Sequence, residues 1–138
     1  MAVIAVTPII MNDVVLTIGT DNYEAHVSKV VFTPSAEVVK WKSLTPTGTH
    51  SFPTTADWVV DMDYAQDWAT VNSLSRYLMD NEGTSKTMVF KPKKPTTTGP
   101  TWTATVYITP GAIGGEVDGV ATASVQLGVS GKPVLTTA

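Results

Sequence analysis

The stretch Asp57-Trp58-Val59-Val60-Asp61-Met62-Asp63-Tyr64 carries the clearest structural pattern in the chain. Its even positions are aromatic or apolar, and three of its odd positions are aspartates. Successive side chains of a β-strand point to opposite faces of the sheet. The alternation therefore predicts a strand with one face in a core and the other in contact with water.

Shorter patterns of the same kind lie on both sides of this stretch. β-Branched and aromatic residues are enriched in strands, and clusters of glycine, proline, asparagine and aspartate separate the segments. In residues 38–42, valine and tryptophan alternate with Lys40 and Lys42. We predict six or seven strands, drawn from residues 14–18, 25–32, 38–42, 57–64, 87–90, 102–108 and 120–127.

The hydrophobic period changes between Ala65 and Asn81, where apolar residues recur three or four positions apart. This spacing is typical of an amphipathic helix, and Gly83 fits a helix stop. We predict one helix over this segment. Its core side chains are expected to be Trp68, Val71, Leu74 and Leu78.

Two segments without periodicity are predicted to be irregular. Residues 43–55 are rich in proline, glycine and threonine, and they are long for a connection inside a compact domain. Leu44 and Phe52 favour a binding role for this loop, since a purely solvated loop has little use for them. Residues 128–138 are predicted to form a C-terminal arm. No repeat or domain boundary is visible, so residues 1–138 are expected to form a single domain.

The composition excludes several kinds of site. The chain has no cysteine, which rules out disulfides, thiolate metal sites and a cysteine nucleophile. The net charge is −3, and the nearest approach to a basic run, at Lys91, Lys93 and Lys94, is interrupted by proline. The apolar first residues lack a basic leader and fall short of the ~20 residues of a membrane span. We expect neither an export signal nor membrane insertion.

No set of residues points to catalysis. His26 and His50 lie in different elements and lack the spacing of a zinc site. Asp61 and Asp63 would lie about 6–7 Å apart along a strand, which is near the separation used by glycosidases. Their side chains would point in parallel from a wet face, however, whereas a hydrolase needs one carboxyl buried enough to keep its proton. We expect no enzymatic activity, no metal and no cofactor.

The order of these elements carries a resemblance. A β-hairpin leads through the long loop into the acidic strand, and the helix and a short strand, Met88-Val89-Phe90-Lys91-Pro92, follow it. Two alternating strands and the segment Gly128-Val129-Ser130-Gly131-Lys132-Pro133 complete the chain. In this order the sequence resembles the major tail tube proteins of long-tailed (siphovirus-type) bacteriophages, above all in Asp67–Gly83 and Val120–Pro133.

The resemblance implies a mainly β fold: a β-sandwich of six to seven strands flanked by one α-helix, whose inner sheet joins a ring-wide β-barrel. It implies homo-hexameric rings that stack into a hollow tube in the virion after assembly in the host bacterial cytoplasm. The expected partners are a tape-measure protein and tail-tip and terminator proteins, and double-stranded DNA passes through without stable binding. Loop 43–55 and arm 128–138 would act as inter-subunit elements.

Two groups of site residues follow from this reading. Acids and hydroxyls on the channel wall leave DNA mobile, whereas each lysine or arginine on a phosphate adds salt-dependent affinity. The candidates for facing the lumen are Asp61, Asp63, Thr103, Thr105, Ser124 and Gln126. Lys40 and Lys42 would partly offset the acids if their strand also lined the bore. The candidates for ring stacking are Leu44, Pro46, His50, Phe52 and Pro53.

Two other functions stay open at this point. Another virion structural protein, such as a tail terminator or a head decoration protein, would form single rings or isolated subunits in place of a stacked tube. A carbohydrate-binding β-module would need exposed tryptophans as sugar platforms. The alternation places Trp58 and Trp102 on apolar faces, which disfavours the carbohydrate-binding function.

Overall fold

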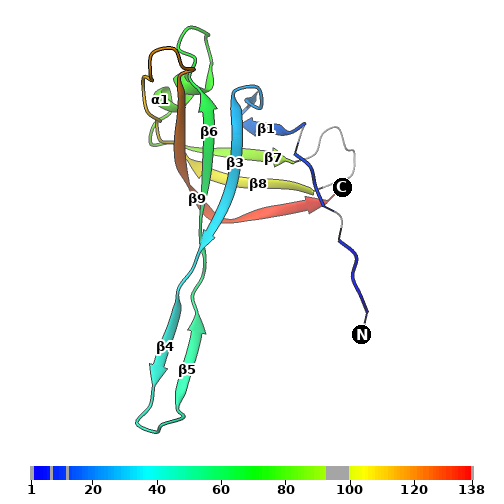
Figure 1. Cartoon of the computed structure of the whole chain (residues 1–138), viewed down its shortest axis with the longest axis vertical. Coiled ribbons are helices and arrows are strands. Elements are labelled where there is room, and N and C mark those ends of the chain that lie inside the picture. The colour runs from blue at the N-terminus through cyan, green and yellow to red at the C-terminus, as the bar shows by residue number, and fades with distance from the viewer. Residues whose placement is uncertain (1, 7, 12, 93–99, 138) are drawn as a thin grey trace.

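The computed structural model describes residues 2–6, 8–11, 13–92 and 100–137, and it is mainly β with one short helix (Figure 1). Every strand pair in this part of the chain is antiparallel, which confirms the predicted fold class at this level. The elements are β1 (Val15–Ile18), β2 (Asp21–Asn22), β3 (Val27–Ser35), β4 (Val38–Lys42), β5 (Thr49–Pro53), β6 (Asp57–Ala65), α1 (Leu74–Asp80), β7 (Ser85–Lys91), β8 (Pro100–Tyr107) and β9 (Thr122–Thr137).

Seven strands form one sheet in the order β2-β1-β7-β8-β9-β6-β3, and β4 and β5 form a separate two-stranded ribbon. The 16-residue strand β9 joins the two halves of the large sheet. Its first half pairs with β6 and its second half with β8, and Gly128 lies opposite both Val59 and Tyr107. In Figure 1, β9 runs alongside β6 and then turns across the molecule beside β8.

The predicted C-terminal arm is therefore wrong for the described residues up to Thr137, which belong to β9. The register between β8 and β9 shifts between Thr103 and Thr105, and Gly131 has a positive φ of 76° in the same region. Glycine adopts this conformation without the steric cost that a side chain would bring. The glycines thus accommodate a bulged, bent strand, where the sequence pattern had indicated its end.

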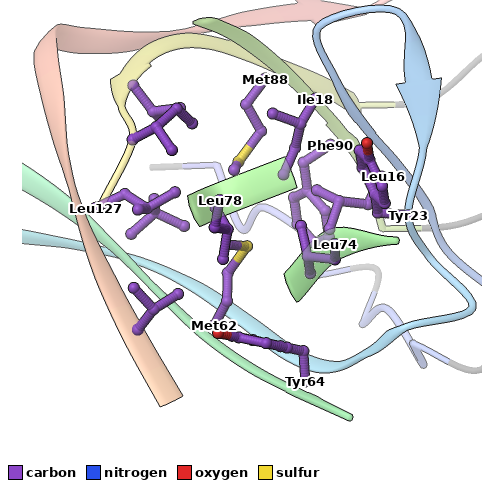
Figure 2. Packing of buried hydrophobic residues seen from close by; sticks show 14 of the residues in the cluster. Leu16, Ile18, Tyr23, Met62, Tyr64, Leu74, Leu78, Met88, Phe90 and Leu127 are labelled. Atoms are coloured by element: carbon purple, nitrogen blue, oxygen red, sulfur yellow. The ribbon is translucent and has the colours of Figure 1, made fainter. Parts of the chain in front are cut away.

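The bend brings the apolar faces of both sheet halves around one core. Side chains at alternate positions of β1, β6, β7, β8 and β9 are buried there, and two leucines of α1 complete the cluster (Figure 2). The alternation predicted for residues 57–64 is confirmed, since Val60, Met62 and Tyr64 are buried. The other buried members are Leu16, Ile18, Tyr23, Leu74, Leu78, Met88, Phe90, Val106, Ile108, Ala123, Val125 and Leu127.

The helix is much shorter than predicted and begins at Leu74. Leu74 and Leu78 are fully buried as expected, whereas Trp68 and Val71 are 37% and 73% exposed and do not belong to the helix core. Asp67 explains the late start: its carboxylate accepts hydrogen bonds from the backbone N–H groups of the two residues that follow Trp68. Such side-chain bonds compete with helix formation, and Asn72 adopts a positive φ of 66° just before the helix begins.

The predicted loop 43–55 is also wrong in part, because residues 49–53 form β5 and pair with β4 across five residue pairs. Both faces of this ribbon are exposed to solvent. The short alternation of His50 and Phe52 with small polar residues lies among Pro46, Gly48 and Pro53, which indicate turns and conceal the strand.

The different environments of Leu74 and Val71 give a direct test of the helix position. Leu74→Ala removes a fully buried side chain and should lower the free energy of unfolding by about 2–5 kcal/mol. Val71→Ala is the matched control and should change it by less than about 0.5 kcal/mol, because Val71 is exposed. Urea unfolding followed by circular dichroism measures both. Equal losses in the two variants would contradict the short helix.

Candidate assembly surfaces

The ribbon of β4 and β5, here called the hairpin (residues 38–53), projects from the body as a narrow arm (Figure 1). Among the described strands and helix, β4 and β5 lie against each other alone. An isolated two-stranded hairpin is marginally stable in water, so its base needs support. The backbone N–H of Thr54 donates to the carbonyl of Glu37, and this bond connects the hairpin ladder to the pairing of β3 with β6.

One face of the hairpin is aromatic and apolar. Val39 pairs with Phe52 and Trp41 pairs with His50, so all four side chains point the same way. The His50 ring lies 5.6 Å from Trp41 and 6.5 Å from Phe52, measured between ring centroids. The exposed fractions of Val39, Trp41 and Phe52 are 51%, 58% and 56%. We call these four residues the aromatic face.

The opposite face of the hairpin is basic and polar. Lys40 pairs with Ser51 and Lys42 with Thr49, and no carboxylate lies between residues 38 and 53. These lysines stand outside the seven-stranded sheet, so within the chain they do not offset its aspartates.

The tip of the hairpin is held by its own hydrogen bonds. The Ser43 N–H donates to the Gly48 carbonyl at 2.6 Å, and the hydroxyls of Ser43 and Thr45 lie 2.7 Å apart. A Cβ at Gly48 would collide with the hydroxyl and the Cβ of Ser43, so any other residue would force this turn to rearrange. Leu44 stands fully exposed at the end of the arm.

All five residues predicted for ring stacking thus lie on one projection. Leu44 and Pro46 lie at its tip, His50 and Phe52 lie on the aromatic face, and Pro53 lies on the other face at its base. Trp41, which the sequence pattern assigns to a strand, belongs to the same projection although it is not among the predicted stacking residues. Its alternation with the lysines was the signal that assigns it to the same face as Phe52.

The lumen-facing candidates lie on the side of the large sheet that faces away from the core. Asp61 pairs with Gln126 and Asp63 pairs with Ser124 across β6 and β9. The Gln126 amide donates to the Asp61 carboxylate at 3.1 Å, and the Ser124 hydroxyl donates to Asp63 at 2.6 Å. Lys29 of β3 lies opposite Asp63 on the same face. This arrangement gives two hydrogen-bonded rungs on a half-exposed surface.

Thr103 and Thr105 belong to the same side of the sheet but lie farther along it. Thr105 on β8 pairs with Ser130 on β9, whose alternation continues from Ser124 and Gln126 through Gly128. The structure therefore brings four of the six candidates into direct contact and places the two threonines beyond the bend of β9. We call this surface the polar sheet face, comprising Asp61, Asp63, Thr103, Thr105, Ser124 and Gln126.

A largely buried aromatic cluster is the strongest candidate for a catalytic site, in contrast to the assembly surfaces described above. The ring of Tyr23 lies 5.9 Å from His26 and 5.4 Å from Tyr77 between centroids. Burial, helped by the nearby Asp21 carboxylate, raises the pKa of Tyr23 to about 12, and burial also raises the pKa of Tyr77. An acid–base group works best with a pKa near the operating pH, and the raised pKa values move these phenols away from it.

Within the described residues, no three His, Asp or Glu side chains are arranged to hold a metal ion. The part of the chain that the structure describes contains no helix long and apolar enough to span a membrane.

No protein-family model matches the chain, and no curated protein matches it significantly.

The pKa of Tyr23 predicts how stability depends on pH. Because the folded state holds the phenol proton more tightly than the unfolded chain, the free energy of unfolding should fall as pH rises from about 10 toward 12. Tyr23→Phe should make this fall shallower. Tyr107→Phe, at a half-exposed ring, is the control and should leave the slope unchanged. Urea unfolding at several alkaline pH values measures the slope, and an identical slope in Tyr23→Phe and the parent protein would contradict the prediction.

Proposed function

We propose that this chain is the structural subunit of a phage tail tube, in which hexameric rings stack into a hollow conduit for the viral genome. The observation that carries the proposal is the hairpin. It extends an exposed aromatic face beyond the body and has no packing partner among the described elements of its own chain. Large exposed apolar surfaces on soluble proteins mark interaction sites, and a projecting arm reaches a neighbouring subunit more easily than it reaches its own core.

The unpaired edges of the sheet support assembly into a closed ring, in which edge strands of neighbouring subunits pair. The nine-residue strand β3 ends one side of the sheet and the two-residue strand β2 ends the other. A strand edge with free N–H and C=O groups is a template for pairing with another chain. In the proposed ring, the bent sheet acts as a β-sandwich with α1 at its flank, and the inner sheets of six copies join into one barrel.

The polar sheet face would form the wall of the channel. Its aspartates accept hydrogen bonds from Ser124 and Gln126, so their carboxylates are held in place on this face. The carboxylates on such a wall repel DNA phosphates, and the hydroxyls do not hold them by charge. The wall therefore adds none of the lysine or arginine contacts to phosphate that release counterions and strengthen binding. Double-stranded DNA would pass without stable binding, and a tape-measure protein would occupy the channel during assembly. The protein would then reside in the virion.

A tail terminator or a head decoration protein is the second candidate, because the same hairpin and sheet edges serve a single ring equally well. Negative-stain electron microscopy separates the two. Stacked tubes support the tail tube, and rings that never stack support a terminator.

The hairpin gives the test of the proposal. Replacing residues 39–52 by an Asn-Gly turn removes the arm while keeping its base, where Val38 pairs with Pro53. The purified parent protein should form rings or tubes at high concentration, and the shortened variant should keep the same circular dichroism spectrum but remain a single subunit. Sedimentation velocity and negative-stain microscopy provide the measurements.

Val117→Ser is the control, since this valine is 91% exposed in a loop remote from the hairpin in sequence. It should assemble as the parent does. Normal tubes from the shortened variant would contradict the role of the hairpin. A parent protein that stays monomeric under all crowding and salt conditions would contradict the tail tube itself.

A further inference from the structure

The body carries an open apolar groove of about 500 Å³ beside its unpaired edge. The groove lies between β1 and the edge strand β3, and Phe90 of β7 contributes to its lining. Its apolar surface includes Leu16, Val27 and Val30. A volume in this range is typical of sites that bind drug-sized groups, and it offers space for aromatic side chains.

The charged residues that line the groove are Asp13, Glu24 and Lys29. Lys29 is paired with Asp63 on the polar sheet face, so the two carboxylates leave the rim with a net negative charge. The Glu24 carboxylate also accepts a long hydrogen bond of 3.5 Å from the backbone N–H of Leu16, which holds it at the groove. The groove is therefore apolar inside and acidic at its rim.

The hairpin has the complementary character. Its aromatic face is apolar, and its only Lys, Arg, Asp or Glu side chains are Lys40 and Lys42. The whole chain has a net charge of −3, so the remainder without these two lysines carries −5. The hairpin is thus a basic, aromatic arm on an acidic body. Complementary charges of this kind guide association and select the partner surface.

A chain's own hairpin does not fill its own groove. In Figure 1 the hairpin points away from the sheet, whereas β1 and β3 border the groove on the sheet itself. The same conclusion follows from the packing, because β4 and β5 contact none of the other described strands or the helix. Arm and groove on different parts of one surface make a head-to-tail contact, which continues from copy to copy and builds rings or filaments.

We infer that the groove between β1 and β3 receives the aromatic face of the hairpin from a second copy of this chain. Trp41 and Phe52 enter beside Leu16, Val30 and Phe90. The flexible stems of Lys40 and Lys42 bring their ammonium groups from the outer face of the ribbon to Asp13 and Glu24 at the rim. The inference rests on the proposed self-assembly, and it identifies the receiving site that the proposed function leaves unspecified.

Charge reversal on each side gives a sharp test. Lys40→Glu/Lys42→Glu places acids on both arm and groove, and Asp13→Lys/Glu24→Lys places bases on both. Each variant alone should need at least about tenfold more protein to polymerise, a change that corresponds to 1.4 kcal/mol. In an equimolar mixture every acidic arm finds a basic groove and every basic arm finds an acidic one. The mixture should regain assembly near the concentration of the parent protein, as measured by sedimentation and light scattering.

Two controls separate specific pairing from other effects. Glu82→Lys/Glu116→Lys changes the net charge as much as the groove variant does, but at exposed positions that do not line the groove. It should polymerise as the parent does. Circular dichroism checks that Glu24→Lys leaves the fold intact, and Glu24→Gln, which keeps a hydrogen-bond acceptor, should weaken assembly less than Glu24→Lys.

The outcomes distinguish the inference from the proposed function. A parent protein that never polymerises overturns both. A parent that polymerises while the groove variant assembles normally, or a mixture that does not recover, overturns the inference alone. A truncated variant without residues 1–10 completes the experiment. If this truncation abolishes assembly while both charge reversals have no effect, the apolar N-terminal segment beside Met11 occupies the groove and the hairpin does not.

Discussion

The sharing of β9 between two halves of one sheet is the constraint on which the rest of the structure depends. The strand pairs with β6 before Gly128 and with β8 after it, so the chain cannot bury one half without orienting the other. The bend turns both apolar faces inward around a single core, and α1 packs into this core through Leu74 and Leu78. The side chains that lie between the buried ones in β6, β8 and β9 therefore point outward. Together they form the polar sheet face from residues far apart in the sequence.

The same core supports the exposed hairpin. β3 leads into β4 and β5 leads into β6, so the arm is an extension of a strand pair whose inner side chains, such as Val60 and Met62, are fully buried. The core therefore stabilises the base of a ribbon that is too small to be stable alone. The exposed aromatic side chains would gain burial if a second subunit covered them.

Sequence patterns predicted the elements with one buried face and one wet face. β6, β8 and the first half of β9 alternate clearly, because burial differs between their two sides. The pattern failed for β5, whose short alternation of His50 and Phe52 lies among proline, glycine and small polar residues, and for the second half of β9, where Gly128 and Gly131 belong to a bend inside the strand. The helix was predicted too long because Trp68 and Val71 have helical spacing. In the structure, backbone N–H groups donate to the Asp67 carboxylate and hold that segment in turns. The contacts of Asp61 with Gln126 and of Asp63 with Ser124 depend on strand order, which local patterns do not contain.

The central claim is that copies of this subunit polymerise with the polar sheet face inward and the hairpin directed to a neighbour. Electron cryo-microscopy of the assembled protein measures both directions at once. The account predicts stacked six-subunit rings in which Asp61 and Asp63 line the bore and the β4–β5 hairpin is covered by an adjacent subunit. A polymer with these aspartates on its outer surface, or with the hairpin free in solvent, would contradict it.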